Sequence, residues 1–170
     1  MATVELVCDQ WQDVRNGLIK EVELIPAEQM SFRAAAESRS IIELLQHIVE
    51  SERVLSGEMC RDNTDFRRGF PTMIADFASH VREANAKDAA LDLLRSSFEE
   101  TRQMVEQFGD EKFDEITTRF DGKPSPKLNI LNFTVAHEMY HRGQLTVYER
   151  LLGIEPALTQ FFRKLSATSW

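Results

Sequence analysis

The sequence predicts an all-α protein: a four-helix bundle with a short extra helix between helices two and three. Three observations predict this class. Apolar residues recur every three or four positions over long segments, there are only seven glycine and five proline residues, and no segment alternates as a strand should. A chain of 170 residues is long enough for one well-buried core and short for two. We therefore expect a single domain over residues 1–170.

The first two helices are predicted from their apolar seams and boundary residues. The first seam alternates spacings of three and four and stops at Pro26, which cannot continue a helix. Its members are Val4, Val7, Trp11, Val14, Leu18, Val22 and Ile25. The second helix is expected to begin after Ser38 or Ser40, because serine favours the N-cap position, and to run to about Cys60.

The third and fourth helices carry clearer end signals. Asp88 is the expected N-cap of the third, and Gly109 is expected to close it in the left-handed αL conformation. Ser125 and Pro126 form an N-cap and N1 pair for the fourth, and Gly153 is a strong stop. The fourth helix would then span roughly 27 residues, or about 40 Å.

Two connecting segments are less regular. Apolar spacing within residues 61–87 indicates one shorter amphipathic helix, carried by Phe70, Met73, Ile74, Phe77 and Val81. Residues 113–120, followed by Asp121 and Gly122, are expected to be extended and to end in a turn. We expect almost no sheet.

Composition excludes several classes of partner. A net charge of −8 argues against nucleic acid, because phosphate-backbone binding needs a clustered basic surface. No run approaches the roughly 18 apolar residues that would span a membrane, and the N-terminus lacks the features of a signal peptide. Cys8 and Cys60 suggest no disulfide framework. We expect a cytoplasmic protein that binds neither nucleic acid nor a membrane.

Two histidines near the C-terminal end indicate a metal site. His137 and His141 fall on a predicted buried stripe of the fourth helix, formed by Ile130, Phe133, His137, His141, Gln144, Tyr148 and Leu151. Side chains four residues apart on a helix have Cβ atoms about 5–6 Å apart, close enough to bind one divalent ion. Without a metal, two polar rings would be buried side by side at a cost in free energy.

The expected third ligand is His47. It flanks the apolar stripe of the second helix beside Leu44, where a facing helix can receive it. Three imidazoles leave one coordination position open, as in catalytic zinc sites. Zinc or nickel is the first expectation for the ion, and iron or manganese also bind such nitrogen sites. His80 has no partner at ligand spacing.

Two carboxylates are candidate catalytic groups. Glu138 completes an HExxH motif, in which it would act as a general base, and Glu50 follows His47 by three residues. A zincin protease is disfavoured because the metzincin extension would need glycine and histidine where the chain has Gln144 and Val147. Either carboxylate can instead accept a hydrogen bond from a ligating histidine or remain a solvated charge.

The motifs resemble those of a known family. Residues 137–145, HEMYHRGQL, followed by residues 149–156, ERLLGIEP, look like the C-terminal signature of the DinB family, the damage-inducible proteins related to the YfiT-like metalloenzymes. Residues 44–52, LLQHIVESE, resemble the other motif of that family. The resemblance implies a four-helix bundle over nearly the whole chain, a metal centre at His47, His137 and His141, and a homodimer.

Three functions stay open at this point. An open site can acidify a bound water for hydrolysis, with Glu138 or Glu50 as base. It can also bind a thiol as a thiolate. Similar proteins include S-transferases that use low-molecular-weight thiols such as bacillithiol or mycothiol, and a maleylpyruvate isomerase, so we favour thiol transfer to a small-molecule substrate slightly. The third possibility is a non-catalytic metal-binding protein of the stress response.

Two further residues are candidate ligand-binding groups. Gln144, one turn beyond His141 on the same face, is expected to orient a ligand, with hydrogen bonding to backbone groups as the alternative. Arg61, together with Arg67 and Arg68, would bind a carboxylate or phosphate of the substrate, or would be a solvated loop charge.

Overall fold

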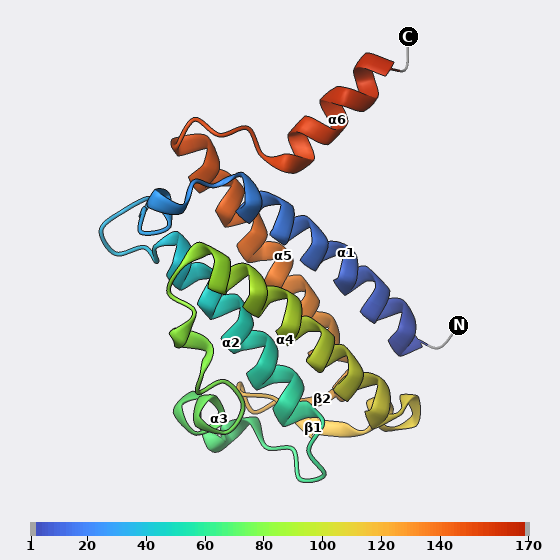
Figure 1. The fold of residues 1–170 in the computed structure, drawn as a ribbon. Helices are drawn as coiled ribbons and strands as arrows, with labels where there is room; N and C mark the ends of the chain where they lie inside the picture. Colours follow the sequence, from blue (N-terminus) through green and yellow to red (C-terminus); the bar gives the residue numbers. More distant parts are fainter. Residues whose placement is uncertain (1–2, 169–170) are drawn as a thin grey trace.

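The computed structural model describes residues 3–168 and confirms the four-helix bundle (Figure 1). The long helices are α1 (Thr3–Leu24), α2 (Ile41–Met59), α4 (Lys87–Phe108) and α5 (Lys127–Leu151). Helices α1 and α2 each pack against both α4 and α5, so α1 and α2 occupy diagonal corners of the bundle. Helices α2 and α4 run in one direction and α1 and α5 in the other.

The predicted starts and stops of the first two helices are confirmed. α1 ends at Leu24, two residues before Pro26. α2 begins after Ser40, whose hydroxyl accepts a hydrogen bond from the backbone N–H of Glu43, while the Glu43 carboxylate accepts one from the backbone N–H of Ser40. This reciprocal capping box satisfies two backbone donors that the first turn of a helix would otherwise leave unpaired.

Three predicted boundary roles differ in the structure. Ser125 and Pro126 belong to a strand, because their backbone pairs with a neighbouring strand before the helix begins. Asp88 lies in the first turn of α4, and Ala86 occupies the N-cap position. Gly109 does have a positive φ of 92°, but its ψ of 135° is extended and not αL. Backbone pairing and the direction of the chain decide where these helices begin and end, and the helix propensity of single residues does not report either of them.

The connecting segments agree with the expectation of one short helix and very little sheet. Helix α3 (Phe70–Phe77) follows α2 and precedes α4 along the chain. Strands β1 (Ile116–Thr118) and β2 (Pro124–Pro126) form an antiparallel hairpin whose turn contains Gly122 at φ 81°. Helix α6 (Ala157–Thr168) was not predicted, and it projects away from the bundle (Figure 1).

The buried face of α5 is rotated relative to the predicted stripe. Phe133 and Leu151 were expected inside, but they are 44% and 59% exposed. The residues that α5 buries are Lys127, Ile130, Leu131, Thr134, Glu138, His141, Leu145, Tyr148 and Glu149. The predicted stripe left out Glu138, which the helix turns into the core because partners on another helix pair with it.

The main partner is Arg15 of α1, whose guanidinium is 1% exposed. Its Nε donates to Glu138 Oε1 at 2.6 Å, and its Nη2 donates to Glu52 Oε2 at 2.7 Å. Its Nη1 donates to the carbonyl oxygen of Leu94 on α4 at 2.6 Å. Trp11 Nε1 donates to the other Glu138 oxygen at 2.7 Å. One buried cation therefore connects all four long helices, and the two carboxylates hold the pKa of Arg15 above its usual range despite burial.

The cysteines and the helix lengths agree with two further expectations. Cys8 and Cys60 are free thiols, and burial raises the pKa of both. Among the described helices, none combines the length and apolar character that crossing a membrane requires.

Candidate functional site

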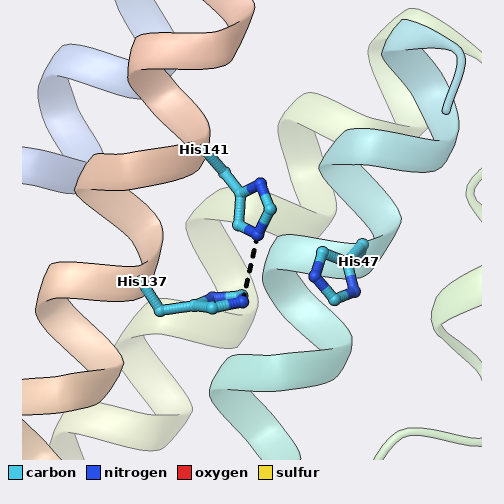
Figure 2. Close-up of side chains that lie close together, drawn as sticks. All are labelled: His47, His137 and His141. Carbon is cyan, nitrogen blue, oxygen red and sulfur yellow. Dashed lines mark hydrogen bonds between the residues drawn. The ribbon is translucent and has the colours of Figure 1, made fainter. Parts of the chain in front are cut away.

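The structure brings together the three histidines that the sequence singles out. His47 projects from α2, and His137 and His141 project from successive turns of α5 on the facing side (Figure 2). Their candidate ligand nitrogens all lie within 4.8 Å of one another. The Nε2 atoms of His137 and His141 are 3.0 Å apart. Because α2 and α5 are antiparallel neighbours, residues 90 or more positions apart in the chain converge on one point.

Their surroundings keep the imidazoles neutral. Burial, followed by the nearby charge of Arg39 and the other histidines, lowers the pKa of His47 to about 3. Burial and His141 lower the pKa of His137 to about 4. Burial also lowers the pKa of His141, although the hydrogen bond that His141 donates to Gln144 opposes this shift. A neutral imidazole has a free lone pair on one ring nitrogen, which is the form that binds metals.

Gln144 fixes the orientation of one ring. Its side-chain oxygen lies 2.8 Å from His141 Nδ1. An amide oxygen can only accept, so Nδ1 carries the proton and the lone pair of Nε2 faces His137, where it can bind a metal ion. A metal-binding histidine usually donates a hydrogen bond of this kind from the ring nitrogen that does not bind the metal. The predicted orienting role of Gln144 thus has a definite geometry, although it acts on a histidine rather than directly on a ligand.

The donor set fits a divalent metal ion. Two nitrogens bound to one tetrahedral ion at about 2.0–2.1 Å lie roughly 3.3 Å apart, close to the 3.0 Å between His137 and His141. Among the described residues, the group of converging donors contains the three imidazoles and no carboxylate or thiol. Three ligands leave room for a further one from solvent or substrate.

Glu138 does not face the histidines. Each residue of a helix is turned by 100° from its neighbour, and this rotation directs Glu138 to α1, where Arg15 and Trp11 occupy both of its oxygens. The carboxylate is 2% exposed. This geometry does not support the role of general base that the HExxH motif predicts, and Glu138 instead belongs to the packing of the bundle.

Glu50 lies next to the histidines. It lines a small cavity of about 180 Å³ together with Arg39, Glu43, Gln46, His47 and Arg82. Its Oε1 accepts a hydrogen bond from Arg82 Nε at 2.7 Å. Glu50 is therefore the predicted catalytic carboxylate that remains within reach of the site.

Arg61 is not brought to the site. It follows the C-terminal end of α2, fourteen residues beyond His47, which corresponds to roughly 20 Å of helix. There its guanidinium pairs with buried Glu58 at 2.9 Å, and Arg68 pairs with the same carboxylate. Arg67 pairs with Asp65. The expectation that these arginines bind substrate has no support from this arrangement, because they neutralise local acids instead.

Arg39 lies beside the histidines and was missed in the sequence. It precedes the N-cap of α2 within the crossover from α1, and its charge contributes to the lowered pKa of all three histidines. No spacing rule relates a loop residue to a helix face, so the sequence offered no signal beyond a basic residue near a helix start.

Comparisons with known proteins agree with the fold and the motifs. The Bacillus subtilis protein YjoA is 26% identical over 143 residues, which cover 82% of this chain and 84% of YjoA. The crystal structure of YjoA, a DinB-like protein, matches with a TM-score of 0.66 and 22% identity over 87% of this chain and 92% of that one. A DinB-like protein from Bacillus cereus ATCC 10987 matches with a TM-score of 0.68 and 18% identity, covering 89% and 94%.

A third solved structure and a family model complete the comparison. A mutant of the mycothiol-dependent maleylpyruvate isomerase matches with a TM-score of 0.64 and 11% identity, over 84% of this chain and 60% of that one. At this identity the likeness is one of fold. The sequence model of the DinB family matches residues 1–170. The chain therefore belongs to the DinB family.

Proposed function

We propose that this protein is a metal-dependent enzyme that transfers a low-molecular-weight thiol to an electrophilic small molecule. His47, His137 and His141 would hold the divalent ion, with zinc or nickel expected first and iron or manganese as alternatives. The observation that carries the proposal is the convergence of three neutral imidazoles with no fourth protein ligand among the described residues. Structural zinc sites normally have four protein ligands, so three favour a reactive site.

The placement of Glu138 favours thiol transfer over hydrolysis. Hydrolysis at a metal commonly needs a carboxylate base close to the bound water. Arg15 and Trp11 already hold the carboxylate of the HExxH motif. A bound divalent ion deprotonates a coordinated thiol by itself, so thiol chemistry needs no such base. One structural neighbour is, by its name, mycothiol-dependent, which supports the same class of chemistry.

The proposed reaction has a simple balance. The sulfur forms a bond to the electrophilic carbon of the substrate, the leaving group departs with the electron pair of the broken bond, and the thiol proton passes to solvent. The histidines would hold the divalent ion that binds the sulfur, and Gln144 keeps His141 in the tautomer that the site needs.

Two alternatives to thiol transfer make different demands on the residues of the site. A hydrolase would depend on Glu50, the carboxylate that shares a cavity with His47. A non-catalytic metal-binding protein of the stress response would bind the ion and show neither activity. The cytoplasmic location expected from the sequence stays a prediction.

Metal binding is tested by removing one ligand at a time. Wild-type protein should bind one zinc ion per chain in equilibrium dialysis, and His141→Ala should bind it at least tenfold more weakly. Gln144→Ala should weaken binding by about 10–100-fold, because it removes the outer partner of a ligand. His47 and His137 have pKa values of about 3 and 4, so protons should compete with the metal only well below pH 6.5.

The matched control for this experiment is His80→Ala. His80 is exposed and does not belong to the histidine group. Equal zinc affinity in the His80→Ala and His141→Ala variants would contradict the assignment of the site.

Thiol transfer is tested with monochlorobimane and a panel of bacterial thiols on metal-loaded protein. We expect release of chloride and formation of the C–S bond above the rate of a His141→Ala control. Glu50→Gln should retain transfer, because the proposed chemistry needs no carboxylate base. If ester or amide hydrolysis is found and Glu50→Gln abolishes it, the hydrolase is correct. If neither activity exceeds the control, the protein is a metal binder.

We also propose that the protein is a homodimer that pairs through α6. This helix points away from its own bundle (Figure 1) and exposes Leu158, Phe161 and Phe162, each about half exposed. It carries two basic and no acidic residues, whereas the whole chain has a net charge of −8. A second copy, with its net negative charge, would therefore attract α6, and a two-fold axis would bury both apolar faces at once.

The homodimer is tested by light scattering after size exclusion. Wild-type protein should have twice the chain mass, and the double variant Phe161→Asp, Phe162→Asp should be monomeric. Phe120→Asp is the control, because Phe120 is similarly exposed at the hairpin turn. A monomeric wild-type protein, or a dimer that survives the double substitution, would overturn the assignment.

A further inference from the structure

Arg39 lines two hollows next to the three-histidine site. It lines the small cavity that contains His47 and Glu50. It also lines a larger open cleft of about 640 Å³, bounded on the α5 side by Gln144 and Tyr148. Gln144 in turn holds His141. Arg39 thus lines both the cavity that contains His47 and the cleft that contains Gln144, the residue hydrogen-bonded to His141.

Helices α2 and α5 both fix the backbone of Arg39. The hydroxyl of Tyr148 on α5 donates a hydrogen bond to the carbonyl oxygen of Arg39 at 2.9 Å. The ring of Tyr148 packs edge-on against Phe32, with centroids 5.9 Å apart. The next residue, Ser40, is the capped start of α2. The backbone of Arg39 is therefore fixed relative to both helices that carry the histidines.

Among the described residues, the guanidinium of Arg39 has no hydrogen-bonding partner, unlike the arginines around it. Arg33 pairs with Glu43 at 2.6 Å, and Arg82 pairs with Glu50 at 2.7 Å. Each of the other arginines in the part of the chain that the structure describes also forms an ion pair with a carboxylate or donates to a carbonyl oxygen. Arg39 is exposed and makes no such bond.

An unpaired arginine at this position has a chemical preference. Its planar fork of N–H groups matches the two oxygens of a carboxylate. Two of the three acids that line these spaces are occupied and compete little for it: Glu43 by its capping box and Arg33, and Glu50 by Arg82. The third acid is Glu37, which lines the larger cleft. The chain has a net charge of −8, but the site combines the positive charge of Arg39 with three histidines that can hold a divalent cation. Both features favour an anionic ligand.

We propose that Arg39 is a specificity-determining residue that binds a carboxylate of the small molecule held at the three-histidine site. This inference rests on the proposed function and names its substrate class: the thiol or its acceptor is a carboxylate-bearing compound. One end of the small molecule would bind at the three-histidine site, and Arg39 would bind the carboxylate at its other end.

The test uses cobalt-loaded protein, in which a bound thiolate gives a sulfur-to-metal charge-transfer absorption. The probes are 3-mercaptopropionate and its neutral counterpart 3-mercaptopropanol. Wild-type protein should bind the carboxylate form roughly five- to tenfold more tightly, as expected for a charged hydrogen bond at a partly solvated site. Arg39→Gln should remove this preference and leave the affinity for the alcohol unchanged.

Arg67→Gln is the matched control, because it removes the same charge at an exposed arginine that pairs with Asp65 beyond the C-terminal end of α2, away from the histidines. It should keep the preference. A preference that survives in Arg39→Gln, or equal binding of both probes to wild-type protein, would overturn the inference while thiol binding itself still stands.

A second titration separates the two proposals. Propionate lacks the thiol, and its binding is followed by the visible absorption of cobalt. If no thiol gives the charge-transfer band, the thiol proposal fails. The role of Arg39 then stands if propionate binds wild-type protein more tightly than Arg39→Gln, and it fails if the two bind propionate equally.

Discussion

The guanidinium of Arg15 holds the four long helices in one arrangement. It donates to carboxylates on α2 and α5 and to a backbone carbonyl on α4, all inside the core. Removing one partner of such a buried pair costs about 3–5 kcal/mol, because the other charge stays buried and uncompensated. The contact with Glu138 sets the rotation of α5 about its axis. That rotation decides which way the neighbouring His137 and His141 point.

The two parts of the HExxH motif therefore have separate tasks. Glu138 faces α1 and stabilises the bundle, while His137 and His141 face α2 and meet His47. This division leaves a site of three neutral nitrogens with no carboxylate base among them, flanked by an unpaired guanidinium at Arg39. Such a site suits a ligand that supplies its own nucleophile and carries a negative charge, and it is poorly equipped for hydrolysis that relies on the motif glutamate.

Most of the fold and the core of the site could be predicted, because apolar spacing and caps are local and two histidines at four-residue spacing share a helix face. The rotation of α5 about its axis could not be predicted, because Glu138 is buried only where Arg15 of α1 pairs with it. A signal did exist: Arg15 lies four residues after Trp11 and three before Leu18, within the apolar seam of α1. Arg39 had no such signal, because its position depends on the path of a loop.

X-ray absorption spectroscopy of protein carrying one zinc ion per chain tests this account most directly. Scattering from the metal counts imidazole ligands and distinguishes them from carboxylate oxygens. The account predicts three imidazoles in the wild-type protein, two in His47→Ala, and a spectrum of Glu138→Gln that keeps all three wherever that variant folds. Fewer than three imidazoles in the wild-type protein, or a carboxylate ligand that Glu138→Gln removes, would contradict it.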